Sequence, residues 1–151
     1  MRPIERILDQ LNAAYGGDAW HGPGLRQLLE DVSEEQARAR PVAGAHSIFE
    51  LVVHARAWLD VVSERLAGTP RELTSEEDWP DVASTSWAAA LEELDRAQSR
   101  VADAVARLST DDLDRAVAGK SYSVYVLVHG VIQHNLYHAG QIALLKRGVA
   151  G

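Results

Sequence analysis

The sequence contains no cysteine, and this absence removes three kinds of chemistry. Without cysteine the chain can form no disulfide, no thiolate metal site and no cysteine nucleophile. Any soft or borderline metal ion that binds must therefore be held by histidine and carboxylate side chains. The missing cysteine does not by itself fix the compartment, but since the sequence also shows neither a signal peptide nor a membrane span, we expect a cytoplasmic protein.

Runs of positive charge and long apolar runs are also absent. The 15 Lys and Arg residues are scattered, and against 22 Asp and Glu residues they leave a net charge of −7. Nucleic acid and anionic membranes bind to clustered Lys and Arg, so we expect neither as a partner. No stretch approaches the roughly 18 apolar residues of a membrane span, and the charged residues 1–8 do not resemble a signal peptide.

What is present is typical of one globular domain. The chain has 151 residues, 46% of them hydrophobic, enough for a core that folds alone. It shows neither an internal repeat nor a low-complexity tract. We therefore expect a single domain over residues 1–151.

Apolar residues recur at helical spacing in four stretches, and no segment alternates like a β-strand. The first stretch, residues 4–32, is interrupted by glycines at 16–17 and is expected to restart as helix at Gly22–Pro23. A capping box that begins at Ser33 predicts a short helical turn, which ends before Pro41.

The other three stretches predict three longer helices. The second follows a Ser47–Glu50 capping box and ends before Gly68. The third begins near Thr85 or Ser86, after a polar connection that is long enough to cross the bundle. The fourth is expected from about Ser121 to Arg147, with a glycine just beyond its end.

Two of the six histidines have the spacing of metal ligands. His134 and His138 are four residues apart, so they lie on the same face of a helix and can reach one ion. A third ligand must come from a neighbouring helix, and His54 is the best candidate because it lies on an apolar helical face. Spacing alone leaves other interpretations open: the pair could be two unrelated surface residues, and His54 a hydrogen-bonded core residue.

Three segments resemble the DinB-like (damage-inducible, YfiT-like) metalloprotein superfamily. They are Gly130–Ile142 (GVIQHNLYHAGQI), His46–Trp58 (HSIFELVVHARAW) and Trp20–Pro23 (WHGP). The resemblance spans nearly the whole chain. It implies an all-α four-helix bundle in up-down-down-up order, with a long crossover between helices two and three. It also implies a divalent metal ion held by His54, His134 and His138.

The residues leave the chemistry of such a site open. Zinc or nickel is expected, because imidazole suits both, and a water or a thiol on the ion would be the reacting group. Asn135 stands where a zincin protease has its glutamate. Glu50 and Gln141 are weak catalytic candidates, since Glu50 is better explained as a helix cap and Gln141 could orient a ligand. Tyr137 and Trp58 are expected to line the cavity.

The remaining candidates are assigned structural roles. His21 is expected to cap the restarting helix, with a place in the metal cavity as the alternative. His46 is expected at the surface and His129 in packing or an interface. Trp79 is expected to pack back onto the bundle from the crossover.

The function we expect is a metal-dependent enzyme that acts on a small molecule. The resemblance implies a thiol S-transferase that uses a low-molecular-weight thiol, and a hydrolase is the other enzyme considered. The alternative is a non-catalytic binding or stress-response module that the metal stabilises. A homodimer is also implied by the resemblance.

Overall fold

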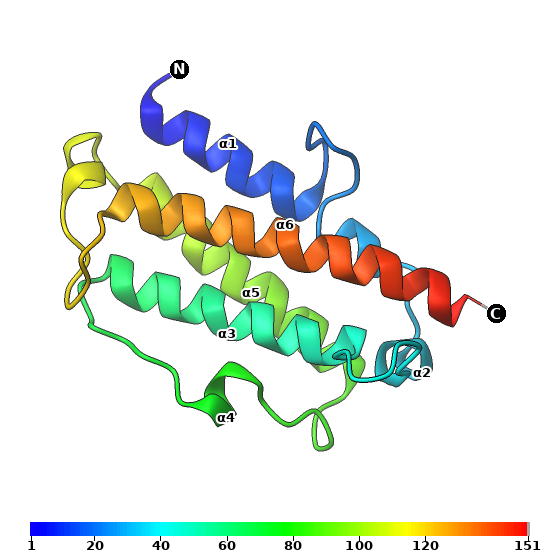
Figure 1. The fold of residues 1–151 in the computed structure, drawn as a ribbon. Coiled ribbons are helices and arrows are strands. Elements are labelled where there is room, and N and C mark those ends of the chain that lie inside the picture. Colours follow the sequence, from blue (N-terminus) through cyan, green and yellow to red (C-terminus); the bar gives the residue numbers. More distant parts are fainter. Residues whose placement is uncertain (151) are drawn as a thin grey trace.

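Four long helices form a bundle in the computed structural model, which describes residues 1–150 (Figure 1). They are α1 (Pro3–Gly16), α3 (Ile48–Leu66), α5 (Trp87–Ala106) and α6 (Val124–Val149). No β-strand occurs in the described residues. The prediction of an all-α fold is therefore confirmed. Within the same range, no helix is long and apolar enough to cross a bilayer.

The helices α1 and α3 each pack against both α5 and α6, so they lie diagonally across the bundle. Figure 1 shows α3 and α5 running in the same direction, opposite to α1 and α6. The predicted up-down-down-up order is confirmed. Each long helix contributes a fully buried side chain to the shared core, namely Leu11, Leu59, Leu94 and Ile142.

The parallel arrangement of α3 and α5 requires the long crossover of residues 67–86. One short helix, α4 (Ser75–Asp78), interrupts this crossover, and the Thr74 side chain accepts a hydrogen bond from the backbone of Glu77 to cap it. Trp79 follows directly and packs on the core, as predicted. The crossover therefore returns to the bundle beside α3.

Serine residues fix the starts of the three later long helices. Ser47, Ser86 and Ser123 each accept a hydrogen bond from the backbone N–H three residues on. The capping box at Ser47 is the predicted one. The last helix begins at Val124, slightly later than expected, because Ser123 rather than Ser121 is its cap.

The end of α6 differs from the prediction. Gly148 lies inside the helix, which continues to Val149, and is not the residue beyond its end. A Cβ atom at position 148 would lie 2.6 Å from Cβ of Pro41. The glycine thus allows Pro41 to pack directly on the helix, a long-range reason that a local cap pattern does not contain.

The expected restart of the first helix is wrong. Residues 22–32 form turns with a single 3₁₀ turn, η1 (Gln27–Leu29), and the predicted short helix follows as α2 (Glu34–Arg38). The backbone N–H of Leu25 donates to the carbonyl of Ala14 at 2.9 Å. This segment is therefore used to complete the hydrogen bonds at the end of α1.

Two glycine substitutions test this packing in opposite directions. A Cβ at Gly24 would lie 2.6 Å from the carbonyl oxygen of Tyr15, so Gly24→Ala should lower the free energy of unfolding by about 1–3 kcal/mol. A Cβ at Gly140, in the middle of α6, meets nothing within 4 Å, so Gly140→Ala should raise it by about 0.5–1 kcal/mol. Urea unfolding measures both, and effects of the same sign would contradict the packing.

Candidate metal centre

Three histidines from two helices meet at one point of the bundle. His54 of α3 and His134 and His138 of α6 offer ligand atoms that all lie within 4.8 Å of one another. The Nε2 atom of His134 is 3.1 Å from Nε2 of His54 and 3.0 Å from Nε2 of His138. Three nitrogens bound to a tetrahedral zinc ion are about 3.3 Å apart. The structure thus brings together all three predicted ligands.

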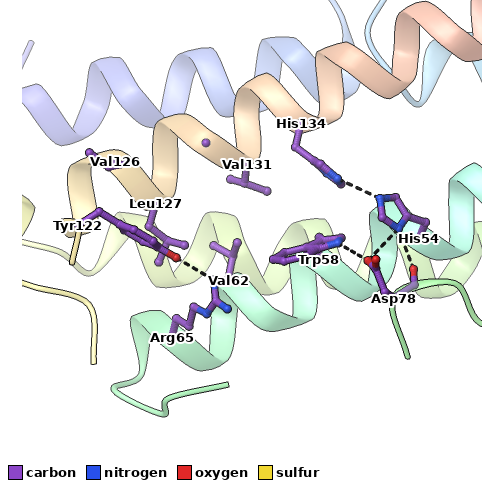
Figure 2. Close-up of a pocket in the computed structure, with 11 residues that line it drawn as sticks. His54, Trp58, Val62, Arg65, Asp78, Tyr122, Val126, Leu127, Val131 and His134 are labelled. Atoms are coloured by element: carbon purple, nitrogen blue, oxygen red, sulfur yellow. Dashed lines mark hydrogen bonds and ion pairs between the residues drawn. The ribbon is translucent and has the colours of Figure 1, made fainter. Parts of the chain in front are cut away.

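Two of the rings are oriented by hydrogen bonds at their other nitrogen. His54 Nδ1 lies 2.7 Å from the backbone oxygen of Asp78 and 3.1 Å from its Oδ1 atom (Figure 2). His138 Nδ1 lies 2.6 Å from Oε1 of Gln141. Since all these partners are acceptors, both Nδ1 atoms carry the hydrogen. The Nε2 atoms of His54 and His138 therefore present lone pairs to the centre.

No neutral form of His134 satisfies this arrangement. With its hydrogen on Nε2, the ring can donate to only one of the two facing lone pairs, which lie 3.0 and 3.1 Å away. The other lone pair is then left without a donor. With the hydrogen on Nδ1, three lone pairs face one another, and Nδ1 is buried without a hydrogen-bond partner among the described residues. A cation at the centre accepts all three lone pairs at once. The donor set fits a divalent metal ion such as zinc or nickel.

The surroundings of His134 and His138 keep these two rings unprotonated. Burial, and then repulsion from the charged forms of His138 and His54, lowers the pKa of His134 to about 3. Burial also lowers the pKa of His138, although the hydrogen bond to Gln141 opposes this. At neutral pH both rings are therefore neutral and able to coordinate.

The crossover holds His54 from outside the bundle. The ring of Trp79 stacks on His54 with 3.9 Å between centroids, and His46 stacks on the far side of Trp79 at 3.5 Å. Asp78 also accepts a hydrogen bond from Nε1 of Trp58 at 2.7 Å. No sequence pattern identifies Asp78, because nothing in a polar loop indicates which of its carboxylates meets a histidine.

The two weak catalytic candidates have different positions. Oε2 of Glu50 accepts from the backbone N–H of Ser47 at 2.8 Å, and the carboxylate also pairs with Arg40, so Glu50 is a helix cap. Gln141 orients His138 by the hydrogen bond described above. Both side chains are thus engaged in hydrogen bonds that hold the structure. These are the structural roles that the sequence suggested for them, a helix cap for Glu50 and the orientation of a ligand for Gln141.

Four other predicted positions lie outside the centre. His21 is exposed, and because the turn after it has Arg26 as N-cap, the expected capping role is wrong. His129 lies 2.9 Å from the backbone oxygen of Tyr125 on its own helix. Tyr137 is 66% exposed and does not line the cavity, contrary to expectation. His46 is exposed, as predicted, although it joins the stack on Trp79.

A cavity of about 480 Å³ adjoins the histidines and runs between α3 and α6 (Figure 2). His54 and His134 form part of its wall at one end, and Arg65 and Tyr122 lie at the other. Trp58 lines it, as predicted. The walls between the ends are largely apolar, formed by Val62, Val126, Leu127 and Val131. Such a volume suits a small organic molecule.

The fold and the centre together define a class: four-helix bundles with a three-histidine site between the second and fourth long helices. The sequence profile of the DinB superfamily matches residues 19–142. The chain belongs to the DinB superfamily, as the three sequence segments indicated.

Solved structures show the same fold at low sequence identity. A conserved protein from Enterococcus faecalis has 14% identity and a TM-score of 0.75, covering 99% of this chain and 98% of that one. A DinB-like protein from Bacillus cereus has 14% identity and a TM-score of 0.69, covering 95% and 89%. A DinB-like protein from Bacillus subtilis has 15% identity and a TM-score of 0.66, covering 94% and 90%. No curated protein matches the sequence.

Removing the partner of His138 should weaken metal binding without removing a ligand. We expect Gln141→Ala to lower the affinity for zinc about 10–100-fold, because the imidazole loses the acceptor that fixes its tautomer. Gln133→Ala, an exposed position on the same helix, is the matched control. Competition with a chromophoric chelator measures both affinities, and equal values would contradict an orienting role for Gln141.

The metal-free protein should lose stability as the solution is acidified. Because the pKa of His134 falls from 6.5 to about 3 on folding, the unfolded chain binds the additional proton between these values. The stability that the neutral His134 ring contributes is complete above pH 6.5. As the pH falls from there to the folded pKa, the free energy of unfolding decreases by about 1.4 kcal/mol per pH unit. His134→Gln should flatten this slope in urea unfolding, whereas His21→Gln should not. An unchanged slope in His134→Gln would contradict the assignment.

Proposed function

We propose that this protein is a metal-dependent enzyme whose three-histidine centre acts on a small molecule, and that its reaction is thiol S-transfer. The observation that carries the proposal is that His54 and His134 are at once members of the histidine cluster and part of the cavity wall. A molecule in the cavity would therefore be in contact with the centre. A purely structural metal site has no need of such access.

The residues of the chain would hold and orient a zinc or nickel ion. His54, His134 and His138 would be the ligands, with Asp78 and Gln141 fixing the first and last of them. Three protein ligands leave a coordination position for a small molecule. When bound, the ion supplies a Lewis acid that lowers the pKa of a thiol or of water.

Thiol transfer is favoured over hydrolysis by the carboxylates around the site. Asp78 lines the cavity, but its side chain already accepts from Trp58 and lies beside His54. Glu50 is occupied as a helix cap. Hydrolysis generally requires a free base to take a proton from water. A low-molecular-weight thiol whose pKa has been lowered is instead present as the thiolate at neutral pH, and the thiolate is itself a strong nucleophile. It would also supply the sulfur chemistry that a chain without cysteine lacks.

The reaction is tested with zinc- or nickel-loaded protein, a panel of thiols and the electrophile monochlorobimane. We expect fluorescence from the thiol conjugate, dependent on metal and on one class of thiol. His138→Ala should reduce the rate at least about 100-fold, because ligand loss exceeds the effect of losing an orienting partner. His129→Ala, on the same helix but outside the cluster, should retain the rate of the unaltered protein.

A different pattern would support the non-catalytic alternative. If no thiol or ester is turned over in a metal-dependent manner, while a chelator lowers the melting temperature substantially, the metal stabilises a binding module. Spectra of the cobalt-substituted protein separate the two cases further. Catalysis requires a ligand position that exchanges with added thiol, and a binding module held by four protein ligands does not have one.

A further inference from the structure

The cavity has two chemically different ends, joined by one face of α3. His54, Trp58 and Val62 are each four residues apart, and Arg65 follows three residues later, so all four share a face (Figure 2). From His54 to Arg65 this face is about 16 Å long. The opposite wall comes from α6. The cavity is thus elongated along the bundle, with the histidines at one end only.

The far end is built around a buried arginine. The side chain of Arg65 is only 3% exposed. Its Nε and Nη2 atoms donate to the carbonyl oxygen of Arg71 at 3.0 and 2.7 Å, and Nη2 lies 3.3 Å from Oε2 of Glu72. Its Nη1 atom donates to the hydroxyl of Tyr122 at 2.8 Å. These contacts use four of the five N–H groups of the guanidinium.

Two donors remain at this end of the cavity. One is the second N–H of Arg65 Nη1, and the other is the O–H of Tyr122, whose oxygen accepts from Arg65 and whose hydrogen is free. Both side chains line the cavity. Among residues 1–150, no acceptor is described for either group. An oxygen atom of a ligand at this point could accept from both.

The charges give a ligand one preferred direction. The carboxylate beside Arg65 is Glu72, which is 69% exposed and also pairs with Lys120, so two cations share one carboxylate here. At the other end, the carboxylate of Asp78 lies beside His54. An anionic group is therefore attracted to Arg65 and repelled by Asp78 when no metal ion is present. A carboxylate matches this end, because charge-assisted hydrogen bonds to arginine and tyrosine are strong.

We propose that the cavity binds small carboxylic acids with an apolar body, the carboxylate lying at Arg65 and Tyr122. The body lies along Trp58 and the apolar walls, and the end remote from the carboxylate reaches His54 and His134. That reacting end rests on the proposed function, whereas carboxylate binding at Arg65 does not. The substrate class is thus an apolar monocarboxylate with its electrophilic carbon far from the acid group.

Glycine at position 130 leaves part of the cavity open. Gly130 lines the cavity, and a Cβ atom there would meet nothing within 4 Å. A glycine inside a helix costs about 1 kcal/mol relative to alanine, and here it keeps space for a ligand. A large side chain at this position should fill the cavity without disturbing the packing of the bundle.

The test measures binding by calorimetry with 4-phenylbutanoate and octanoate, and with 4-phenylbutan-1-ol as the neutral counterpart. Metal-free and zinc-loaded protein are both titrated. We expect both acids to bind to the metal-free protein, with 4-phenylbutanoate at least about tenfold tighter than the alcohol, because a charge-assisted hydrogen bond contributes more than a neutral one. Tyr122→Phe should weaken acid binding about tenfold and alcohol binding less, because the alcohol loses only a neutral hydrogen bond.

Two glycine variants locate the binding site. Gly130→Leu should abolish binding of acid and alcohol alike, whereas Gly140→Leu, at an exposed and equally open position of the same helix, should leave both unchanged. Circular dichroism and urea unfolding confirm that each variant is folded. Tyr122→Phe keeps the test valid even where Gly130→Leu alters the helix.

Several outcomes would overturn the proposal. They are no acid binding, equal binding of acid and alcohol, or acid binding that Tyr122→Phe leaves unchanged. Acid binding that requires zinc and is lost in His134→Ala would place the carboxylate on the metal instead of on Arg65. Failure of the proposed function is distinct from these: acids would bind to the metal-free protein as expected, while the zinc-loaded protein would show no thiol transfer.

Discussion

The convergence of three imidazole lone pairs is the constraint on which the site depends. Asp78 and Gln141 fix the tautomers of the two outer rings, so their Nε2 atoms cannot donate to each other or to His134. His134 lies between them with its second nitrogen buried and unpartnered among the described residues. Hydrogen bonds within the protein cannot relieve this arrangement, and a cation can. The surrounding contacts therefore favour an ion-bound form.

The same two helices serve both the centre and the cavity. The α3 face carries His54 at one end and Arg65 at the other, and α6 supplies the opposite wall and two ligands. Each polar end is fixed by the crossover, through Asp78 for His54 and through the carbonyl of Arg71 for Arg65. The crossover that makes α3 and α5 parallel is thus also the segment that orders the site.

The sequence predicted those features that local patterns determine. Helical periodicity and serine caps specify α3, α5 and α6 closely, and the spacing of His134 and His138, with the family segments, specifies the cluster. Features that depend on distant contacts were missed. Gly148 packs against Pro41 more than a hundred residues away, and the partners of Arg65 come from two loops whose paths no periodicity records.

The separation of His54 and His134 by 80 residues has a consequence for biosynthesis. At about 5–20 residues per second, a ribosome adds the second ligand several seconds or more after the first. A nascent chain that exposes only His54 offers an ion a single imidazole, which is too weak a ligand to retain it. The complete set forms only once α6 has been made and docked. Any choice among metal ions would therefore fall to the finished protein and to the ions then available to it.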